Sequence, residues 1–272
     1  MKQEINPQET NRAKAFELWT KSPMPMVTLT KTFDVTRLYK VSRRKGLKFN
    51  AILCWCIGKA ASQTEEFFLL PEHEKLFKYD RLAINVIVNN KVGGINSCDI
   101  PYTDDFEQFS TEYLTLTQSA SMSCKSTFEA DSMVIGTSAM IATKLDGIIN
   151  QYTDQFCNPM VMWGKYRKGW FKVTLPISFQ FHHVQMDGGH AAKFLDELQT
   201  VINSIKLHKI MCTSIVVNKK KTIVGWNLDI RDFNEVSQTV CPTVISMVFD
   251  VTDKAVYWCH NRDYGQIETK RF

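Results

Sequence analysis

Several signals that would assign this chain to a specialised class are missing from its sequence. No stretch approaches about 18 uninterrupted apolar residues, and the start MKQEINPQETNR lacks the apolar core of a secretory signal. The eight cysteines form neither C-x-x-C pairs nor a zinc-type pattern with histidine. We therefore expect a cytoplasmic protein with free thiols, without a membrane partner and without a metal.

Signatures of nucleotide and nucleic-acid binding are missing as well. The chain has no G-x-G-x-x-G or Walker loop, and no repeat or low-complexity tract. Its net charge is +5 over 272 residues, and the short run Lys219-Lys220-Lys221 is typical of a solvated hairpin turn. We expect no nucleic acid among the partners of this protein.

What the sequence does contain is a mixed series of helix and strand patterns. Helical spacing of apolar residues predicts helices at about 10–20, 35–44, 50–63, 104–119 and 188–206. Strand patterns predict strands at about 26–33, 82–89 and 133–140, and a long hairpin over 159–183. With 44% hydrophobic residues, this order predicts an α+β fold in which helices pack on a mixed sheet. A composition break at residues 206–209 divides the chain into 1–208 and 209–272.

The most informative segment is the decapeptide FHHVQMDGGH at residues 181–190. It ends a predicted strand and precedes a helical pattern, so His182 and His183 stand on a tight turn between the two. Histidine has the unperturbed pKa nearest neutrality and is the usual proton-transfer residue. Because adjacent strand residues face opposite sides, only one of the pair can look into a given site. The alternative is a core or interface histidine beside an ordinary turn at Asp187-Gly188.

Other motifs share their order and spacing with this decapeptide over about residues 8–206. They are NRAKAFE at 11–17, Lys48-Phe49 before an apolar helix, PYTDDFEQF at 101–109, VIGTSA at 134–139 and Gly164-Lys165-Tyr166. Together they resemble the chloramphenicol acetyltransferase family. The resemblance implies a two-layer sandwich of the coenzyme A-dependent acyltransferase type. It also implies acetyl-CoA as cosubstrate, a small-molecule hydroxyl acceptor and a homotrimer.

The resemblance assigns roles to individual residues of this chain. His183 matches the general base, which later returns its proton to the coenzyme A thiolate, and His182 is read as structural. Ser138 matches the serine that donates a hydrogen bond to the oxyanion. Asp187 matches an aspartate that pairs with the amino-terminal arginine, here Arg12, and holds the loop, although a catalytic-triad role is the tempting alternative.

The donor and acceptor pockets differ in how well they match. Three residues fall on positions that meet the phosphates and adenine of coenzyme A: Lys48, Lys165 and Tyr166. In the acceptor pocket, Met162 replaces a threonine that orders a water, Val27 replaces an aromatic residue and Trp19 replaces a tyrosine. Residues 91–97 also lack a Thr-Phe-Ser element that lines the chloramphenicol pocket. We therefore expect acetyl-CoA use to be better preserved than chloramphenicol as the acceptor. In the trimer that the resemblance implies, His183 would meet Ser138 and Trp19 of the adjacent chain.

The segment 209–272 resembles something else, the first hairpin of the N-terminal-nucleophile amidohydrolases of the choloylglycine hydrolase and acid ceramidase group. Cys212 would be the thiol nucleophile, but it is internal, and Trp226 stands where that group has an arginine. The segment is also too short for the layered sheets of that fold, so we expect a truncated, β-rich appendage. Three hypotheses stay open: an acetyl-CoA-dependent O-acetyltransferase, a thiol-nucleophile amidohydrolase built on Cys212, and a non-catalytic trimeric binding module.

Overall fold

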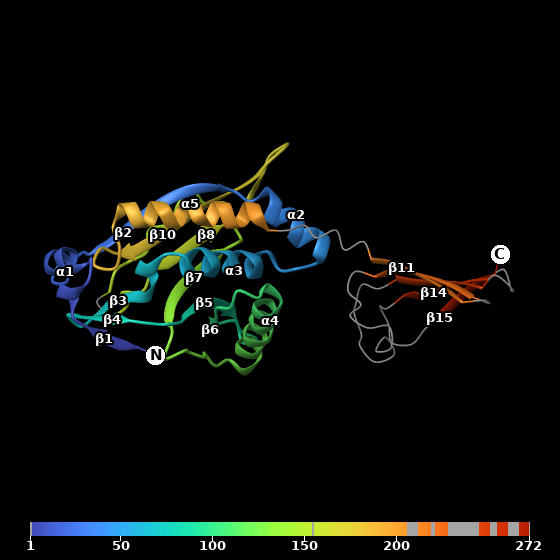
Figure 1. The fold of residues 1–272 in the computed structure, drawn as a ribbon, viewed down its shortest axis with the longest axis horizontal. Coiled ribbons are helices and arrows are strands. Elements are labelled where there is room, and N and C mark those ends of the chain that lie inside the picture. The colour runs from blue at the N-terminus through green and yellow to red at the C-terminus, as the bar shows by residue number, and fades with distance from the viewer. Residues whose placement is uncertain are drawn as a thin grey trace. The chain divides into compact units, whose positions relative to one another are not determined.

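The computed structural model describes residues 2–153 and 155–205, and beyond them the backbone of five strands between residues 212 and 271. The chain forms two compact units, Met1–Ile205 and Lys206–Phe272 (Figure 1). The break between them lies next to the composition break at residues 206–209. Within the described residues, no helix is both long and apolar enough to cross a membrane.

A seven-stranded mixed sheet forms the centre of the first unit. Its strands are β2 (Met26–Asp34), β5 (Leu82–Asn89), β6 (Ile95–Pro101), β7 (Met133–Met140), β8 (Met160–Gly164), β9 (Arg167–Lys168) and β10 (Val173–His182). They lie in the order β2-β10-β8-β7-β5-β6, with β9 paired to β10. The β5–β7 and β7–β8 pairs are parallel and the others are antiparallel. This arrangement confirms the predicted α+β fold with a mixed sheet.

The helices that bury apolar residues against the sheet or against one another are α2 (Thr36–Lys45), α3 (Phe49–Ser62), α4 (Phe106–Ser123) and α5 (Gly188–Ser204). Helix α1 (Ala13–Trp19) has no buried residue. Figure 1 shows α3 and α5 side by side along the sheet. Rings of Phe67, Phe179 and Phe194 pack together with centroids 4.7–5.8 Å apart and join β10 to α5. Helix α2 ends at Gly46, whose φ of 66° is a left-handed conformation that glycine adopts without steric cost.

The other face of β10 is covered by a loop rather than by a helix. Side chains alternate along a strand, so Ser178 and Gln180 point away from the phenylalanine cluster. The Ser178 hydroxyl accepts a hydrogen bond from the Ile148 N–H at 2.8 Å, and the Gln180 amide donates to the Asn150 carbonyl at 2.9 Å. This loop therefore ties the middle of β10 to the chain between β7 and β8.

A small second sheet lies near the amino terminus and was not predicted. It consists of β1 (Gln3–Ile5), β4 (Lys75–Lys78) and β3 (Leu69–Glu72), with two 3-10 helices at Pro7–Glu9 and Glu65–Phe68. The turn between β3 and β4 is formed by His73 and Glu74, whose φ values are 47° and 61°. Both signs are positive, as in a type I′ turn, but neither residue is the asparagine or glycine that usually marks one. The sequence therefore carried no turn signal here.

The second unit is an antiparallel meander. Its strands are β11 (Cys212–Asn218), β12 (Lys221–Asn227), β13 (Ile245–Asp250), β14 (Ala255–His260) and β15 (Ile267–Arg271), paired in chain order. Lys219 and Lys220 of the predicted hairpin turn lie outside the described residues, as does the side chain of Cys212. The amidohydrolase resemblance of this unit thus stays a prediction.

Candidate active site

The paired histidines lie where β10 ends. His182 is the last strand residue and His183 opens a turn, in which the His183 N–H donates to the Pro25 carbonyl at 2.8 Å. The N–H groups of Gln185 and Met186 both donate to the His182 carbonyl, at 2.9 and 3.2 Å. Only His182 therefore belongs to the strand, and His183 lies one residue beyond it. The direction of the His183 side chain is set by this turn and by the residues that form hydrogen bonds with it.

The turn is held by the guanidinium of Arg12, which is 4% exposed. Its Nε donates to the Val184 carbonyl at 2.9 Å and one terminal nitrogen donates to the His183 carbonyl at 2.9 Å. The other terminal nitrogen lies 3.1 Å from the Asp187 carboxylate. The structure thus brings the predicted partners Arg12 and Asp187 together. Arg12 also donates a hydrogen bond to the backbone carbonyl of His183.

Asp187 is at the same time the N-cap of α5. Its Oδ1 accepts hydrogen bonds from the N–H groups of Gly189 and His190, at 3.0 and 3.4 Å. Burial acts to raise the pKa of Asp187, but the hydrogen bonds from Arg12 and His190 and the charges of both residues outweigh it and lower the pKa. An ionised Asp187 therefore joins the turn to the start of the helix.

The imidazole of His183 is stacked on the indole of Trp19. Their ring centroids are 4.6 Å apart and the rings are within 6° of parallel. Nδ1 of His183 is buried and has no hydrogen-bond partner. Both rings belong to one chain, which corrects the expectation that Trp19 reaches His183 from a neighbouring subunit. The stack restricts rotation of the imidazole and leaves Nε2 as the nitrogen able to meet a bound molecule.

His182 is held differently, in the interior. Its Nδ1 accepts a hydrogen bond from the Val184 N–H at 3.0 Å, and the residue is 3% exposed. Burial, and then the charge of His183, lower the pKa of His182 to about 4. His182 is therefore neutral at neutral pH and part of the turn's internal bonding.

The other predicted residues near the base separate into two groups. Val27 on β2 pairs with Phe181, so it lies beside the end of β10. Ser138 pairs with Met162, which pairs with Ser178 in the middle of β10. At about 3.3 Å per strand residue, the five positions from Ser178 to His183 span roughly 17 Å. A single chain therefore brings Trp19 and Val27 to His183, and does not bring Ser138 or Met162 there.

The predicted coenzyme A residues share one pocket of about 500 Å³, which is lined by Lys48, Lys165, Tyr166, Phe49 and Trp163, among others. The Tyr166 ring packs 5.2 Å from the Phe49 ring and 5.3 Å from the Tyr39 ring, between centroids. Two lysines and a supported aromatic ring thus face one space. Phe49 and Trp163 were not predicted as pocket residues, because apolar patterning assigns them to the core.

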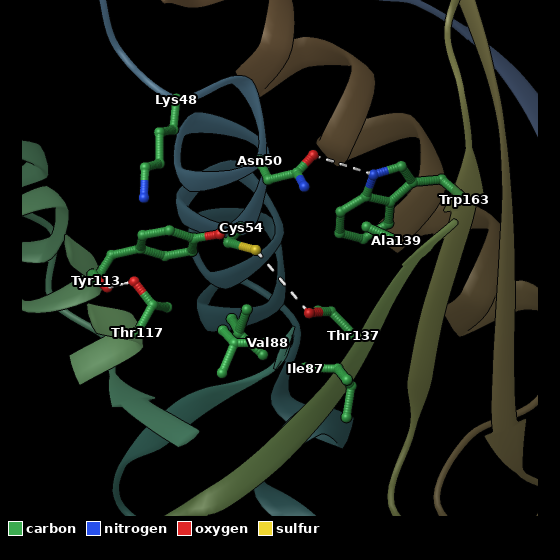
Figure 2. A pocket seen from close by; sticks show the side chains of 11 residues that line it. Lys48, Asn50, Cys54, Ile87, Val88, Tyr113, Thr117, Thr137, Ala139 and Trp163 are labelled. Atoms are coloured by element: carbon green, nitrogen blue, oxygen red, sulfur yellow. Dashed lines mark hydrogen bonds between the residues drawn. The ribbon is translucent and has the colours of Figure 1, made fainter. Parts of the chain in front are cut away.

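A smaller pocket of about 110 Å³ adjoins the first and shares Lys48, Asn50, Tyr113 and Trp163 with it (Figure 2). The Trp163 Nε1–H donates to the Asn50 side-chain oxygen at 3.4 Å, across the junction of the two. The thiol of Cys54 lines this smaller pocket, and burial raises its pKa to about 12. Cys54 is therefore a neutral wall residue and not a thiolate nucleophile.

Comparison with known proteins shows the family to which the first unit belongs. A family model described as chloramphenicol acetyltransferase matches residues 3–199. Chloramphenicol acetyltransferase 3 of Escherichia coli is 26% identical over 183 residues, covering 65% of this chain and 85% of the relative. The solved structure of a chloramphenicol acetyltransferase has a TM-score of 0.62 and 17% identity, covering 74% of this chain and all of the other. The dihydrolipoamide acetyltransferase of Azotobacter vinelandii has a TM-score of 0.53 and 16% identity, covering 73% of this chain and 87% of the other.

The mixed sheet with its histidine-bearing turn is that of an acyltransferase, and the match extends over nearly all of the first unit. The chain belongs to the chloramphenicol acetyltransferase family. The second unit lies outside the matched residues.

Proposed function

We propose that this acyltransferase moves an acetyl group from acetyl-CoA to a hydroxyl of chloramphenicol or a related small molecule, with His183 as general base. The observation that carries the proposal is the fixed geometry of His183. Arg12 holds its carbonyl at 2.9 Å, and Trp19 stacks on its imidazole. A base that is held in one orientation accelerates the reaction through its position beside the substrate as well as through proton transfer.

The chemistry balances with one histidine. Nε2 of His183 takes the proton of the acceptor hydroxyl while the oxygen attacks the thioester carbonyl. When the tetrahedral intermediate collapses, the carbon–sulfur bond breaks and the same nitrogen returns the proton to the departing thiolate. The products are an acetyl ester and free coenzyme A, and no other reactant is needed.

The pocket of Lys48, Lys165 and Tyr166 suits the donor. Coenzyme A carries phosphates and an adenine, which favour cationic side chains and a flat aromatic surface respectively. We infer that the two lysines meet the phosphates and that Tyr166, supported by Phe49 and Tyr39, meets the adenine.

We further propose that the site is completed in a homotrimer. An oxyanion donor must lie within hydrogen-bond distance of the reacting carbonyl. In one chain, however, Ser138 is offset from His183 by roughly 17 Å along the strand direction, and it also lies two strands away from β10. A cyclic interface that sets Ser138 of one subunit beside His183 of the next would close this gap. Light scattering should report a trimer, and mixing His183→Ala with Ser138→Ala subunits should restore part of the activity. A monomeric active enzyme would contradict this arrangement.

The acceptor site is where this chain departs most from the residue pattern of the family. Chloramphenicol carries a nitrophenyl ring, and such a ring gains binding from aromatic and apolar walls. Val27 and Met162 replace an aromatic residue and a hydroxyl residue of the family pattern. We expect chloramphenicol to be acetylated weakly or not at all, and a different hydroxyl compound to be the better acceptor.

The test is release of free thiol from acetyl-CoA by the full-length chain against a panel of hydroxyl acceptors that includes chloramphenicol. Acceptor-dependent release should fall by about 10²–10⁴-fold or more in His183→Ala, the range expected for a general base. His182→Asn, which keeps the acceptor for the Val184 N–H, is the matched control and should stay active at neutral pH. No release with any acceptor, despite binding of acetyl-CoA, would instead indicate a non-catalytic binding module.

A further inference from the structure

The turn that carries His183 has a second anchor, which lies on the 3-10 helix Glu65–Phe68 and is not used above. The Glu66 carboxylate lies 3.2 Å from Nε2 of His190, the third residue of α5. Nδ1 of the same imidazole accepts a hydrogen bond from the Asp187 N–H at 3.3 Å and lies 3.0 Å from the Asp187 carboxylate. His190 therefore bridges Glu66 and Asp187.

The burial of Glu66 shows that this contact is specific. Glu66 is 7% exposed, whereas its neighbour Glu65 in the same 3-10 turn is exposed. A carboxylate is costly to bury unless a donor or a cation faces it. His190 is the ion-pair partner that the described part of the chain provides for Glu66.

The bridge persists in both protonation states of His190. In the neutral imidazole, Nδ1 accepts from the Asp187 N–H and the proton on Nε2 faces Glu66. In the cation, the two ring nitrogens face the carboxylates of Asp187 and Glu66. A second tie runs parallel to it, because the Gln185 amide donates to the Leu69 carbonyl at 2.6 Å. The segment 65–69 thus contacts the chain that carries His183 at two points, at Gln185 and at His190.

We propose that Glu66 and His190 are positioning residues for the base, and this inference rests on the proposed role of His183. Glu66 holds His190, His190 holds Asp187 through Nδ1, and Asp187 orients Arg12. Arg12 in turn fixes the carbonyl of His183. Neither Glu66 nor His190 touches a substrate in this scheme. Their loss therefore displaces the imidazole of His183 without changing either binding pocket.

The first experiment compares Glu66→Leu with Glu65→Leu, which makes the same change one residue away on the exposed side. Glu66→Leu should lower kcat by about 10- to 100-fold, because a displacement of about 1 Å in a catalytic group costs on that order. KM for acetyl-CoA and for the best acceptor should change by less than about twofold. Glu66→Gln keeps an oxygen that accepts from Nε2 and should recover most of the lost kcat. Folded Glu66→Leu with wild-type kcat would overturn the proposal.

A second variant remains decisive if Glu66→Leu does not fold. Asparagine at position 190 offers an oxygen near Nδ1 that can accept from the Asp187 N–H, but its side chain is too short to reach Glu66. His190→Asn should therefore fold, with kcat reduced and both KM values retained. Wild-type kcat in folded His190→Asn would contradict the bridge.

A measurement independent of catalysis uses amide hydrogen exchange. Exchange in the peptide that contains residues 183–189 should accelerate in His190→Ala, because the Asp187 N–H loses its side-chain acceptor, and stay unchanged in Glu65→Leu. Unchanged exchange in His190→Ala would count against the bridge. Activity retained by His183→Ala would reject the proposed function itself. Loss of activity in His183→Ala, with no effect at Glu66 or His190, would reject only this inference.

Discussion

Replacing His182 with asparagine should remove much of the acid sensitivity of the first unit. The His182 side chain is 3% exposed, and its Nδ1 accepts the Val184 N–H at 3.0 Å. A nitrogen that accepts this bond carries no proton, so the folded state holds the neutral imidazole. Asparagine offers an oxygen near the position of Nδ1, and the variant therefore keeps the hydrogen bond and loses the titration.

The size of the effect follows from the pKa of His182. Burial, and then the charge of His183, lower this pKa from 6.5 to about 4. A difference of about 2.5 pH units at about 1.4 kcal/mol each corresponds to about 3.5 kcal/mol, of which about 3 kcal/mol is lost by pH 4. The unfolded chain takes up the proton at the higher pH. The contribution is therefore fully present above pH 6.5 and is lost as the pH falls toward 4.

Urea unfolding followed by near-ultraviolet circular dichroism between pH 4 and 7.5, at one protein concentration, measures this contribution. The wild-type unfolding free energy should fall with pH by about 3 kcal/mol more than that of His182→Asn. His73→Asn is the control: His73 is exposed with a φ of 47°, which asparagine tolerates, so its pH dependence should match the wild type. Equal pH dependence in wild type and His182→Asn would refute the reasoning.

Three further outcomes are expected. Arg12→Lys should lower the free energy of unfolding by about 3 kcal/mol, because one ammonium group cannot reach all three acceptors of the guanidinium. Urea unfolding at neutral pH measures this, and a loss under about 0.5 kcal/mol would contradict it. Gly58→Ala should destabilise α3 by about 1–3 kcal/mol, since the added Cβ would lie 2.3 Å from the Tyr102 ring, and adding Tyr102→Leu should relieve it in the same assay. A chain cut after Lys206 should keep acetyl transfer and its oligomeric state by light scattering, because the residues removed lie beyond the last helix of the first unit; loss of assembly would assign them a structural role.

The local elements of the first unit could be predicted closely from the sequence. Residues 133–140 and 82–89 were predicted as strands and form β7 and β5 with those limits. Alternating or helical apolar spacing predicts such elements because each element must bury one side. The apolar residues of that side are close together in the sequence, so their spacing can be read directly. The pairing of Arg12 with Asp187, and the placement of Lys48 and Lys165 in one pocket, were implied by the family resemblance and not by local spacing.

Tertiary structure alone decided which distant residues meet. The small sheet contains a turn with positive φ values at His73 and Glu74, and its strand β4 pairs with the amino-terminal strand β1. Glu66 shows no pattern that distinguishes it from Glu65, yet one is buried against His190 and the other is exposed. The stack of Trp19 on His183 within one chain likewise follows from the path of α1. Sequence periodicity reports which side of an element is buried. Which partner covers that side depends on the three-dimensional arrangement of elements far apart in the chain.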